Sequence, residues 1–121
     1  MSDYTTEELQ AARDALTDAR ALRTNGTREG TINRLYYACF HAAKGVLYTR
    51  GIEPGTHEGV VNQFGEQIVL QGDATRDDGR FLNELHALRM TADYEHNQVD
   101  TDIDELFNRS EEFVDDMVDI L

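Results

Sequence analysis

The sequence predicts an all-α fold, an up-and-down bundle of about five helices. Three observations lead to this prediction. Apolar residues recur at intervals of three and four along most of the chain, which is the spacing that lines one face of a helix. No segment shows the sustained alternation of apolar and polar residues that marks a half-buried strand. The stretches between the helical segments are short, which in a helical protein favours antiparallel neighbours.

The first helix is predicted to begin at Thr5 and to end at Gly26. Thr5 and Glu8 have the spacing of a capping box, in which a hydroxyl and a carboxylate bond the unpaired amides of the first turn. Gly26 follows the last apolar position, where glycine commonly ends a helix. The inward face is expected to consist of Leu9, Ala12, Leu16 and Ala19.

The second and third helices are predicted over residues 27–50 and 56–72. Gly51 ends the second helix, and Pro54, the only proline, marks a turn before Thr56 caps the third. The apolar stripe of the second helix is Ile32, Leu35, Tyr36, Cys39, Ala42, Ala43, Val46 and Leu47. That of the third is Val60, Val61, Phe64 and Ile68.

A polar loop with a frayed helical start is expected over residues 73–79, with the fourth helix following over residues 80–96. Residues 101–104, Thr-Asp-Ile-Asp, are predicted to cap the fifth helix. The fourth helix is expected to turn Phe81, Leu85, Leu88 and Ala92 inward. The stripe of the fifth is Ile103, Leu106, Phe107, Ser110, Phe113, Val114, Met117 and Leu121.

The protein is predicted to have a strongly acidic surface. Its 24 acidic residues outnumber 11 basic ones, for a formal net charge of −13, and Lys44 is the only lysine. Such a surface is typical of proteins that function in concentrated salt. There the screening length is only ~3 Å at 1 M, so the repulsion between carboxylates is removed. A basic partner that docks on these carboxylates is the alternative. Because residues 28–56 carry a net +2 and residues 100–121 a net −8, any bound anion is expected at the second helical segment or its neighbour.

Composition and motifs exclude several classes of protein. The chain is 40% hydrophobic, which suits one folded domain over residues 1–121. It has neither a transmembrane stretch of ~20 apolar residues nor the signature of a secretory signal. The lone Cys39 is expected to be a buried thiol in a cytoplasmic protein. With no glycine-rich phosphate loop, no cysteine pair and no paired Glu-x-x-His motif, neither a metal nor a cofactor is expected.

The fourth helix carries the candidate site. Arg89 and His96 are seven residues apart and so share one face, about 10.5 Å apart along the axis. A guanidinium binds phosphate with two parallel hydrogen bonds, and an imidazole moves protons near neutral pH, so the pair suits phosphodiester chemistry. Arg34 is a candidate to join Arg89 in a phosphate-binding cluster. The structural alternative is an ordinary i,i+4 surface pair of Arg89 with Asp93, and a helix-capping role for His96.

Other residues are weaker candidates. His57 is expected at a helix start, and His41 and His86 as half-buried helix residues. The adjacent Tyr36 and Tyr37 are expected to belong to the core more readily than to form a base-stacking platform.

Three segments together resemble the HEPN domain family. The first is residues 33–44, Asn-Arg-Leu-Tyr-Tyr-Ala-Cys-Phe-His-Ala-Ala-Lys, which resembles the signature helix of that family. The second is Arg-Gly-Ile-Glu-Pro at residues 50–54, with Thr56-His57 after it, and the third is Arg-x-x-Ala-Asp-Tyr at residues 89–94. The resemblance covers roughly residues 28–121. It is specific as a set, although no single segment would be.

The resemblance implies a helical bundle that dimerises. Many HEPN domains look like metal-independent ribonucleases, often the toxin half of a pair with a small nucleotidyltransferase antitoxin. Their active motif is an arginine followed by a histidine after four to six residues, and two protomers bring these motifs together in a cleft. By resemblance, Arg89 would hold the scissile phosphate and His96 would assist attack by the ribose 2′-hydroxyl, leaving a cyclic phosphate without a metal.

The same resemblance implies roles for two neighbours of Arg89. Asp93 would support the site, and Tyr94 would bond the phosphate or be modified by the antitoxin. The chain places Tyr94 before His96, the reverse of their order in the best-studied toxins.

Three functions remain open on these grounds. The first is a HEPN ribonuclease toxin that acts on RNA and is neutralised by a nucleotidyltransferase. The second is a non-catalytic dimeric HEPN adaptor that binds a nucleotide, RNA or a partner protein. The third is a helical interaction protein whose acidic last helix meets a basic partner.

Overall fold

The computed structural model describes residues 3–94 and 101–121 of the chain, and within these ranges it is all-α, with no strand. This confirms the predicted fold class. The described ranges hold five α-helices and one π-helical turn: α1 (Asp3–Asn25), α2 (Arg28–Thr49), α3 (His57–Phe64), η1 (Gly65–Val69), α4 (Arg76–Tyr94) and α5 (Ile103–Asp119).

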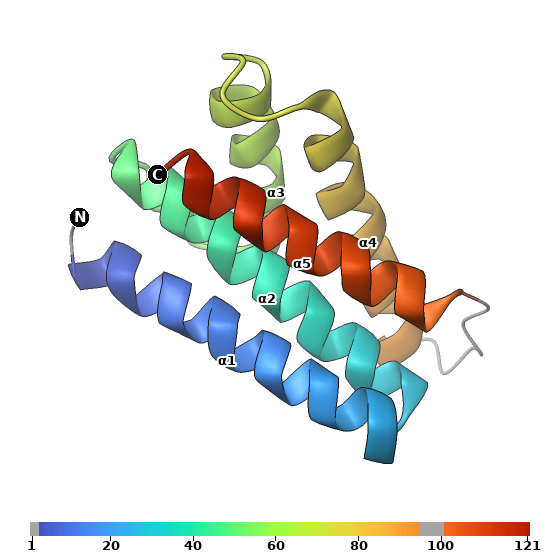
Figure 1. Ribbon diagram of the computed structural model, residues 1–121. Helices are drawn as coiled ribbons and strands as arrows, with labels where there is room; N and C mark the ends of the chain where they lie inside the picture. Colours follow the sequence, from blue (N-terminus) through green and yellow to red (C-terminus); the bar gives the residue numbers. More distant parts are fainter. Residues whose placement is uncertain (1–2, 95–100) are drawn as a thin grey trace.

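Helix α2 is the centre of the arrangement. It runs back along α1, and α5 lies along it as well (Figure 1). Helices α3 and α4 form an antiparallel pair that packs on the same central helix from another side. Twelve of the 22 residues of α2 are buried, so its side chains serve four neighbours at once, as expected of a helix whose apolar stripe is wide.

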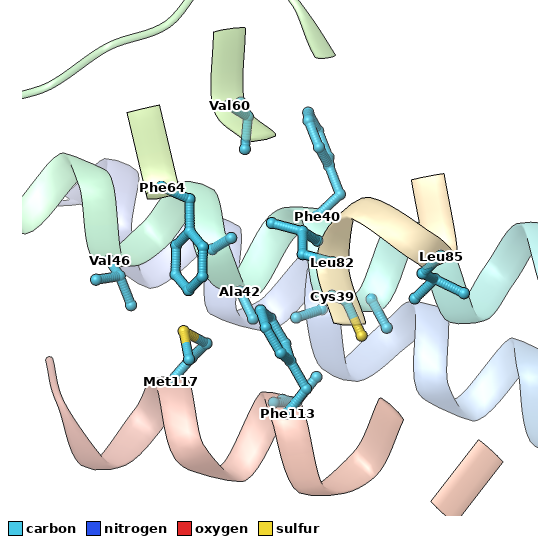
Figure 2. Packing of buried hydrophobic residues seen from close by; sticks show 14 of the residues in the cluster. Cys39, Phe40, Ala42, Val46, Val60, Phe64, Leu82, Leu85, Phe113 and Met117 are labelled. Carbon is cyan, nitrogen blue, oxygen red and sulfur yellow. The ribbon is translucent and has the colours of Figure 1, made fainter. Parts of the chain in front are cut away.

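The core forms where α2, α3, α4 and α5 meet (Figure 2). The ring of Phe113 on α5 lies 5.7 Å from that of Phe64 and 6.0 Å from that of Phe81. Cys39 of α2 is fully buried in this cluster, and burial raises the pKa of its thiol to about 12. The thiol therefore stays protonated and packs as a small apolar side chain, as the sequence predicted.

Three predicted helix starts are confirmed by capping hydrogen bonds. The hydroxyl of Thr27 accepts from the amide of Gly30, and that of Thr56 accepts from the amide of Gly59. At the start of α5 the carboxylate of Asp102 accepts from the backbone amide three residues on. Each cap satisfies a first-turn amide that has no partner inside its helix.

The start of α1 was predicted incorrectly. The helix begins before Thr5, and Thr5 is a fully buried residue within it. A buried side chain on the face toward α2 does not serve as a cap, because the cap position lies where the helix opens to solvent.

The third and fourth helices also differ from prediction. The stretch predicted as one helix to Gly72 changes after Phe64 into the π-helical turn, where the amide of Leu70 bonds the carbonyl of Gly65. Helix α4 begins at Arg76, four residues earlier than predicted, because the hydroxyl of Thr75 accepts from the amide of Asp78 at 3.0 Å. A threonine three residues before an acidic residue is a pattern found at helix starts. The segment was predicted to be a loop because its composition is polar.

An ion pair joins α4 to α5. The Nη2 atom of Arg109 lies 2.9 Å from a carboxylate oxygen of Asp77 and 2.9 Å from one of Asp78, and the guanidinium covers the ring of Phe81. The side chain of Asp78 is only 4% exposed, whereas that of Asp77 is 70% exposed. The two carboxylates therefore bond the same arginine in very different surroundings.

No helix in the described part of the chain has the length and apolar character needed to cross a membrane.

The contrast between the two carboxylates gives a stability prediction. Replacing Asp78 with alanine should lower the free energy of unfolding by about 2–3 kcal/mol, because the guanidinium loses the charged partner that is shielded from water. Asp77→Ala is the matched control and should cost no more than about 1 kcal/mol, since an exposed pair is screened. Urea unfolding followed by circular dichroism at fixed salt measures both. Equal losses would contradict the assignment of the shielded pair as the stabilising one.

Candidate functional site

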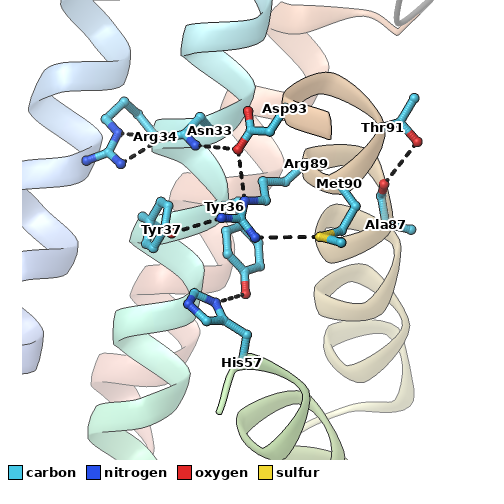
Figure 3. A network of polar contacts seen from close by, with 10 residues as sticks. All are labelled: Asn33, Arg34, Tyr36, Tyr37, His57, Ala87, Arg89, Met90, Thr91 and Asp93. Carbon is cyan, nitrogen blue, oxygen red and sulfur yellow. Dashed lines mark hydrogen bonds and ion pairs between the residues drawn. The ribbon is translucent and has the colours of Figure 1, made fainter. Parts of the chain in front are cut away.

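Arg89 lies on α4 and faces α2, with only 8% of its surface exposed. Its Nε donates to a carboxylate oxygen of Asp93 at 3.0 Å, and its Nη2 donates to the hydroxyl of Tyr37 at 3.0 Å (Figure 3). The guanidinium carbon also lies 5.2 Å and 5.4 Å from the ring centres of Tyr36 and Tyr37. The i,i+4 pair with Asp93 that the sequence indicated is present, but it is buried against α2 and not at the surface.

Arg34 reaches the same network from α2. The side-chain amide of Asn33 donates to Asp93 at 2.8 Å, and its oxygen accepts from Arg34 at 2.7 and 3.0 Å. The guanidinium of Arg34 lies 4.8 Å from the ring centre of Tyr37. The structure thus brings Arg34 and Arg89 to one aromatic ring, with Asn33 and Asp93 linking them (Figure 3).

His57 closes the network from α3. The cap at Thr56 sets the direction of α3, and His57 is its first residue, as the sequence predicted. The imidazole Nδ1 lies 2.8 Å from the hydroxyl of Tyr36, and the ring stacks on Phe40 with 4.4 Å between centres. Figure 3 shows the Tyr36 hydroxyl directed at His57 and the guanidinium of Arg89 beside the same tyrosine.

The surroundings keep this histidine and tyrosine neutral. Burial is the main cause that lowers the pKa of His57 below its usual value near 6.5, and the positive charge of Arg89 lowers it further. Burial likewise raises the pKa of Tyr36 well above its usual value near 10, although Arg89 opposes that change. At neutral pH the Tyr36 hydroxyl therefore keeps its proton, and the resting imidazole is uncharged.

Two of the predicted site residues have side chains that the structure does not describe. Tyr94 is the last residue of that helix, and its side chain is not among the described ones. His96 lies outside the described residues. Asp93 is therefore the last predicted site residue whose contacts the structure gives, and it bonds both Arg89 and Asn33.

Sequence reasoning missed three members of the network. Tyr37 was expected in the core, and Asn33 and His57 were predicted only as parts of the segments that resemble the family, with His57 at a helix start. Asn33 and Tyr37 are four residues apart, which places both on one face of α2. That spacing is the signal available in the sequence. The residues next to His57 in the sequence do not indicate that the fold brings it to Tyr36, which is 21 residues away.

No group of three or more His, Cys, Asp or Glu side chains within residues 3–94 and 101–121 is placed to hold a metal ion. The polar atoms of the network are instead guanidinium, amide, hydroxyl, imidazole and one carboxylate. Such a set can bind an oxyanion through the arginines and exchange a proton through the imidazole.

Comparisons with known proteins give one family and several relatives. A profile of the HEPN domain matches residues 6–121. A protein of Methanocaldococcus jannaschii named "Putative toxin" is 33% identical over 114 residues, which cover 90% of this chain and 85% of that protein. A UPF0332 protein of Thermotoga maritima is 34% identical over 83 residues, covering 69% of this chain and 63% of that protein. A second M. jannaschii protein named "Putative toxin" is 26% identical over 72% of this chain and 59% of its own length.

The half-buried position of Asp93, whose side chain is 22% exposed, leads to a stability prediction. Asp93→Ala should lower the free energy of unfolding by about 1.5–3 kcal/mol, because Arg89 and Asn33 both lose a charged acceptor that is largely shielded from water. Glu84→Ala is the control, since Glu84 is an exposed carboxylate on the same helix and its removal changes net charge equally. Thermal and urea unfolding at the same salt concentration measure the two. The prediction fails if the Glu84 variant loses as much stability as the Asp93 variant.

Proposed function

The chain belongs to the HEPN domain family, and on that premise we propose that it is a metal-independent endoribonuclease of the toxin type. The observation that carries the proposal is the pair of guanidinium groups, from Arg34 and Arg89, at the ring of Tyr37. Two arginines beside one ring suit a phosphodiester, because each guanidinium can bond two phosphate oxygens.

Arg89 is proposed to hold the scissile phosphate. Its Nε and Nη2 are anchored on Asp93 and Tyr37, so the plane of the guanidinium is fixed before substrate binds. A fixed donor stabilises the charge that develops on the phosphate in the transition state without reorganising during the reaction. Arg34 is proposed to bind the same phosphate or its neighbour.

His96 is proposed to assist the attack. It would accept the proton of the ribose 2′-hydroxyl as the 2′-oxygen bonds to phosphorus. Departure of the 5′-oxygen then leaves a 2′,3′-cyclic phosphate on one fragment and a 5′-hydroxyl on the other. The spacing in the sequence supports this role, because His96 follows Arg89 after six residues, as in the motif of the family.

The proposed assembly is a homodimer with a small nucleotidyltransferase antitoxin as partner. Two protomers would bring their Arg89 motifs together, and the antitoxin would silence the site by modifying Tyr94. Two relatives bear the name of putative toxins, which supports a toxin–antitoxin context. The acidic surface is proposed to be an adaptation to concentrated salt.

One observation favours a second candidate function, a non-catalytic dimeric adaptor that binds a nucleotide, RNA or a partner protein. Arg89 is nearly buried and already forms an ion pair with Asp93 at 3.0 Å. A phosphate would have to compete with that carboxylate for the guanidinium. In an adaptor the same ion pair would simply fix α4 on α2.

Cleavage of labelled RNA by the purified protein separates the two functions. In molar potassium chloride with EDTA, the protein should cut RNA and leave cyclic-phosphate ends. Arg89→Ala and His96→Ala should slow cutting by about 10²–10⁴-fold, because each removes a group that acts in the transition state. Arg80→Ala is the matched control, since Arg80 is exposed on the same helix, and it should cut normally.

The variant Arg89→Lys is the control for a folding defect in Arg89→Ala. It keeps the charge near Asp93 but loses the two-point bond to phosphate, so it should remain folded by circular dichroism and still cut slowly. A folded, dimeric wild type that leaves RNA intact would overturn the ribonuclease proposal and favour the adaptor.

The partner proposal has its own measurement. Co-expression with a nucleotidyltransferase encoded beside this chain should add the mass of one or more nucleotidyl groups to the Tyr94 peptide, read by mass spectrometry. Tyr94→Phe should receive no added mass and should keep its toxicity in the presence of the transferase. A modification found on another residue would contradict the choice of Tyr94.

A further inference from the structure

The proposed reaction requires two proton transfers. One Arg89–His96 motif supplies one of them, and the second comes either from His96 of the second protomer in the proposed dimer or from a residue outside the motif. As the 2′-oxygen bonds to phosphorus, its proton must leave. As the bond from phosphorus to the 5′-oxygen breaks, that oxygen must gain a proton, because a ribose alkoxide is a very poor leaving group at neutral pH. In a reaction without a metal ion, a side chain of the site has to donate this second proton.

We propose that His57 of α3 is this proton donor, which makes α3 part of the catalytic site that Arg89 anchors. The inference rests on the ribonuclease function proposed above. It adds a residue that lies outside the Arg89–His96 motif, on a different helix.

The position of His57 meets the geometric need. Its ring lies 5.8 Å from the ring of Tyr36 and 5.7 Å from that of Tyr37, and the guanidinium of Arg89 lies 5.2 and 5.4 Å from the same two rings. Arginine and imidazole therefore lie beside the same two tyrosine rings, and the proposal places the leaving oxygen of a phosphodiester bound at Arg89 on the His57 side of this pair.

The hydrogen bond at Nδ1 leaves the opposite nitrogen for the substrate. Tyr36 holds Nδ1 at 2.8 Å, and no described residue bonds Nε2 of the half-buried ring. In the protonated imidazole, Nδ1–H donates to the Tyr36 oxygen and Nε2–H can donate to the 5′-oxygen. After the transfer Nε2 is bare, while the Nδ1–H bond to Tyr36 is unchanged, so the ring delivers its proton without turning or exchanging tautomers.

The other described histidines are less suited to this step. Nδ1 of His41 is bonded to Glu8 at 2.6 Å, so that ring is tied to α1. Nδ1 of His86 is buried and bonds to no described residue, and the ring packs beside Tyr36. His57 is the ring that has both an orienting hydrogen bond from Tyr36 and a place next to Arg89.

The charges that face His57 make it a strong acid once it is protonated. Arg89 and His86 face it from α4, and His41 and Lys44 face it from α2, beside the neutral Tyr36. Together with burial, these groups hold its pKa below the usual value. A bound phosphodiester carries negative charge and would offset these positive charges, so binding of the substrate favours protonation of His57.

The atom balance is complete with two imidazoles. The 2′-hydroxyl gives its proton to His96, and its oxygen bonds to phosphorus. The bond between phosphorus and the 5′-oxygen breaks, and that oxygen takes the proton from Nε2 of His57. The products are the cyclic phosphate, the 5′-hydroxyl, a protonated His96 and a neutral His57, which regain their starting states by exchange with water.

The test replaces the leaving oxygen with sulfur. Once the cut site is mapped on ordinary RNA, the same oligonucleotide is made with one bridging 5′-sulfur at that site. A thiol ionises near pH 8.5, far more readily than a ribose hydroxyl, so a thiolate leaves without a proton donor. His57→Asn is the variant to use, because its side-chain amide can keep the bond to Tyr36 while Nε2 is lost.

The expected pattern is specific to a proton donor. His57→Asn should cut ordinary RNA about 10²–10⁴-fold more slowly than the wild type, yet cut the sulfur substrate at nearly the wild-type rate. Arg89→Ala should cut both substrates slowly, because it acts on the phosphate. Asn62→Ala is the matched control, since Asn62 is exposed on the same helix as His57, and it should cut both at the wild-type rate.

Two other results would overturn the inference in distinguishable ways. If His57→Asn is folded and cuts both substrates equally slowly, or both normally, His57 is not the donor, while the ribonuclease function stands on the wild-type and Arg89→Ala results. If the wild type cuts neither substrate, the ribonuclease proposal fails and the role of His57 fails with it.

Discussion

Four other helices pack against α2, and the rest of the structure depends on how this one central helix can contact all four of them. A helix with so many neighbours needs apolar or small side chains on most of its circumference, and α2 has Ala38, Ala42, Ala43 and Gly45 among its buried residues. Close packing of these residues leaves little of α2 for polar contacts. The polar residues that remain, such as Asn33, form a narrow strip that has to be satisfied by side chains from the surrounding helices.

The helices around α2 provide hydrogen-bond and ion-pair partners for this strip in two groups. At one end, Asp93 of α4 bonds Asn33, and Arg89 bonds Tyr37. Further along, Glu8 of α1 lies 2.6 Å from Nδ1 of His41 and 3.5 Å from the ammonium nitrogen of Lys44. Burial alone would raise the pKa of Glu8, but the hydrogen bond and charge of His41, with the charge of Lys44, lower it overall. Of the basic side chains on α2, His41 and Lys44 are therefore paired with one of the protein's own acidic groups.

This arrangement bears on how a protein with a net charge of −13 could bind a polyanion. General attraction at long range is unfavourable for such a protein, and high salt would weaken it in any case. Binding would have to depend on a few oriented donors at short range. The Arg34 and Arg89 guanidiniums at Tyr37 are donors of this kind, because hydrogen bonds and ring contacts fix them in place. Fixed donors lose little freedom on binding, which partly compensates for the unfavourable net charge.

The extent to which the sequence was informative differed between the fold and the site. Threonine and aspartate caps, glycines after helix ends and three-four apolar spacing are local signals, and they indicated an all-α chain with caps at Thr27 and Thr56. Local signals were misleading where burial overrode them. Thr5 looks like a cap and is a core residue, and the polar segment before residue 80 looks like a loop although α4 begins within it at Arg76.

The sequence by itself determined the helical class, the family resemblance and the i,i+4 pair of Arg89 with Asp93, because each depends on residues close together in the chain. Only the tertiary structure decided that this pair packs on Asn33 of α2, that Arg89 reaches the tyrosine ring beside Arg34, and that His57 meets Tyr36. Those contacts join residues 21 to 60 positions apart. They follow from how α3 and α4 pack on α2, and packing of separate helices is not encoded in the spacing of residues within any one of them.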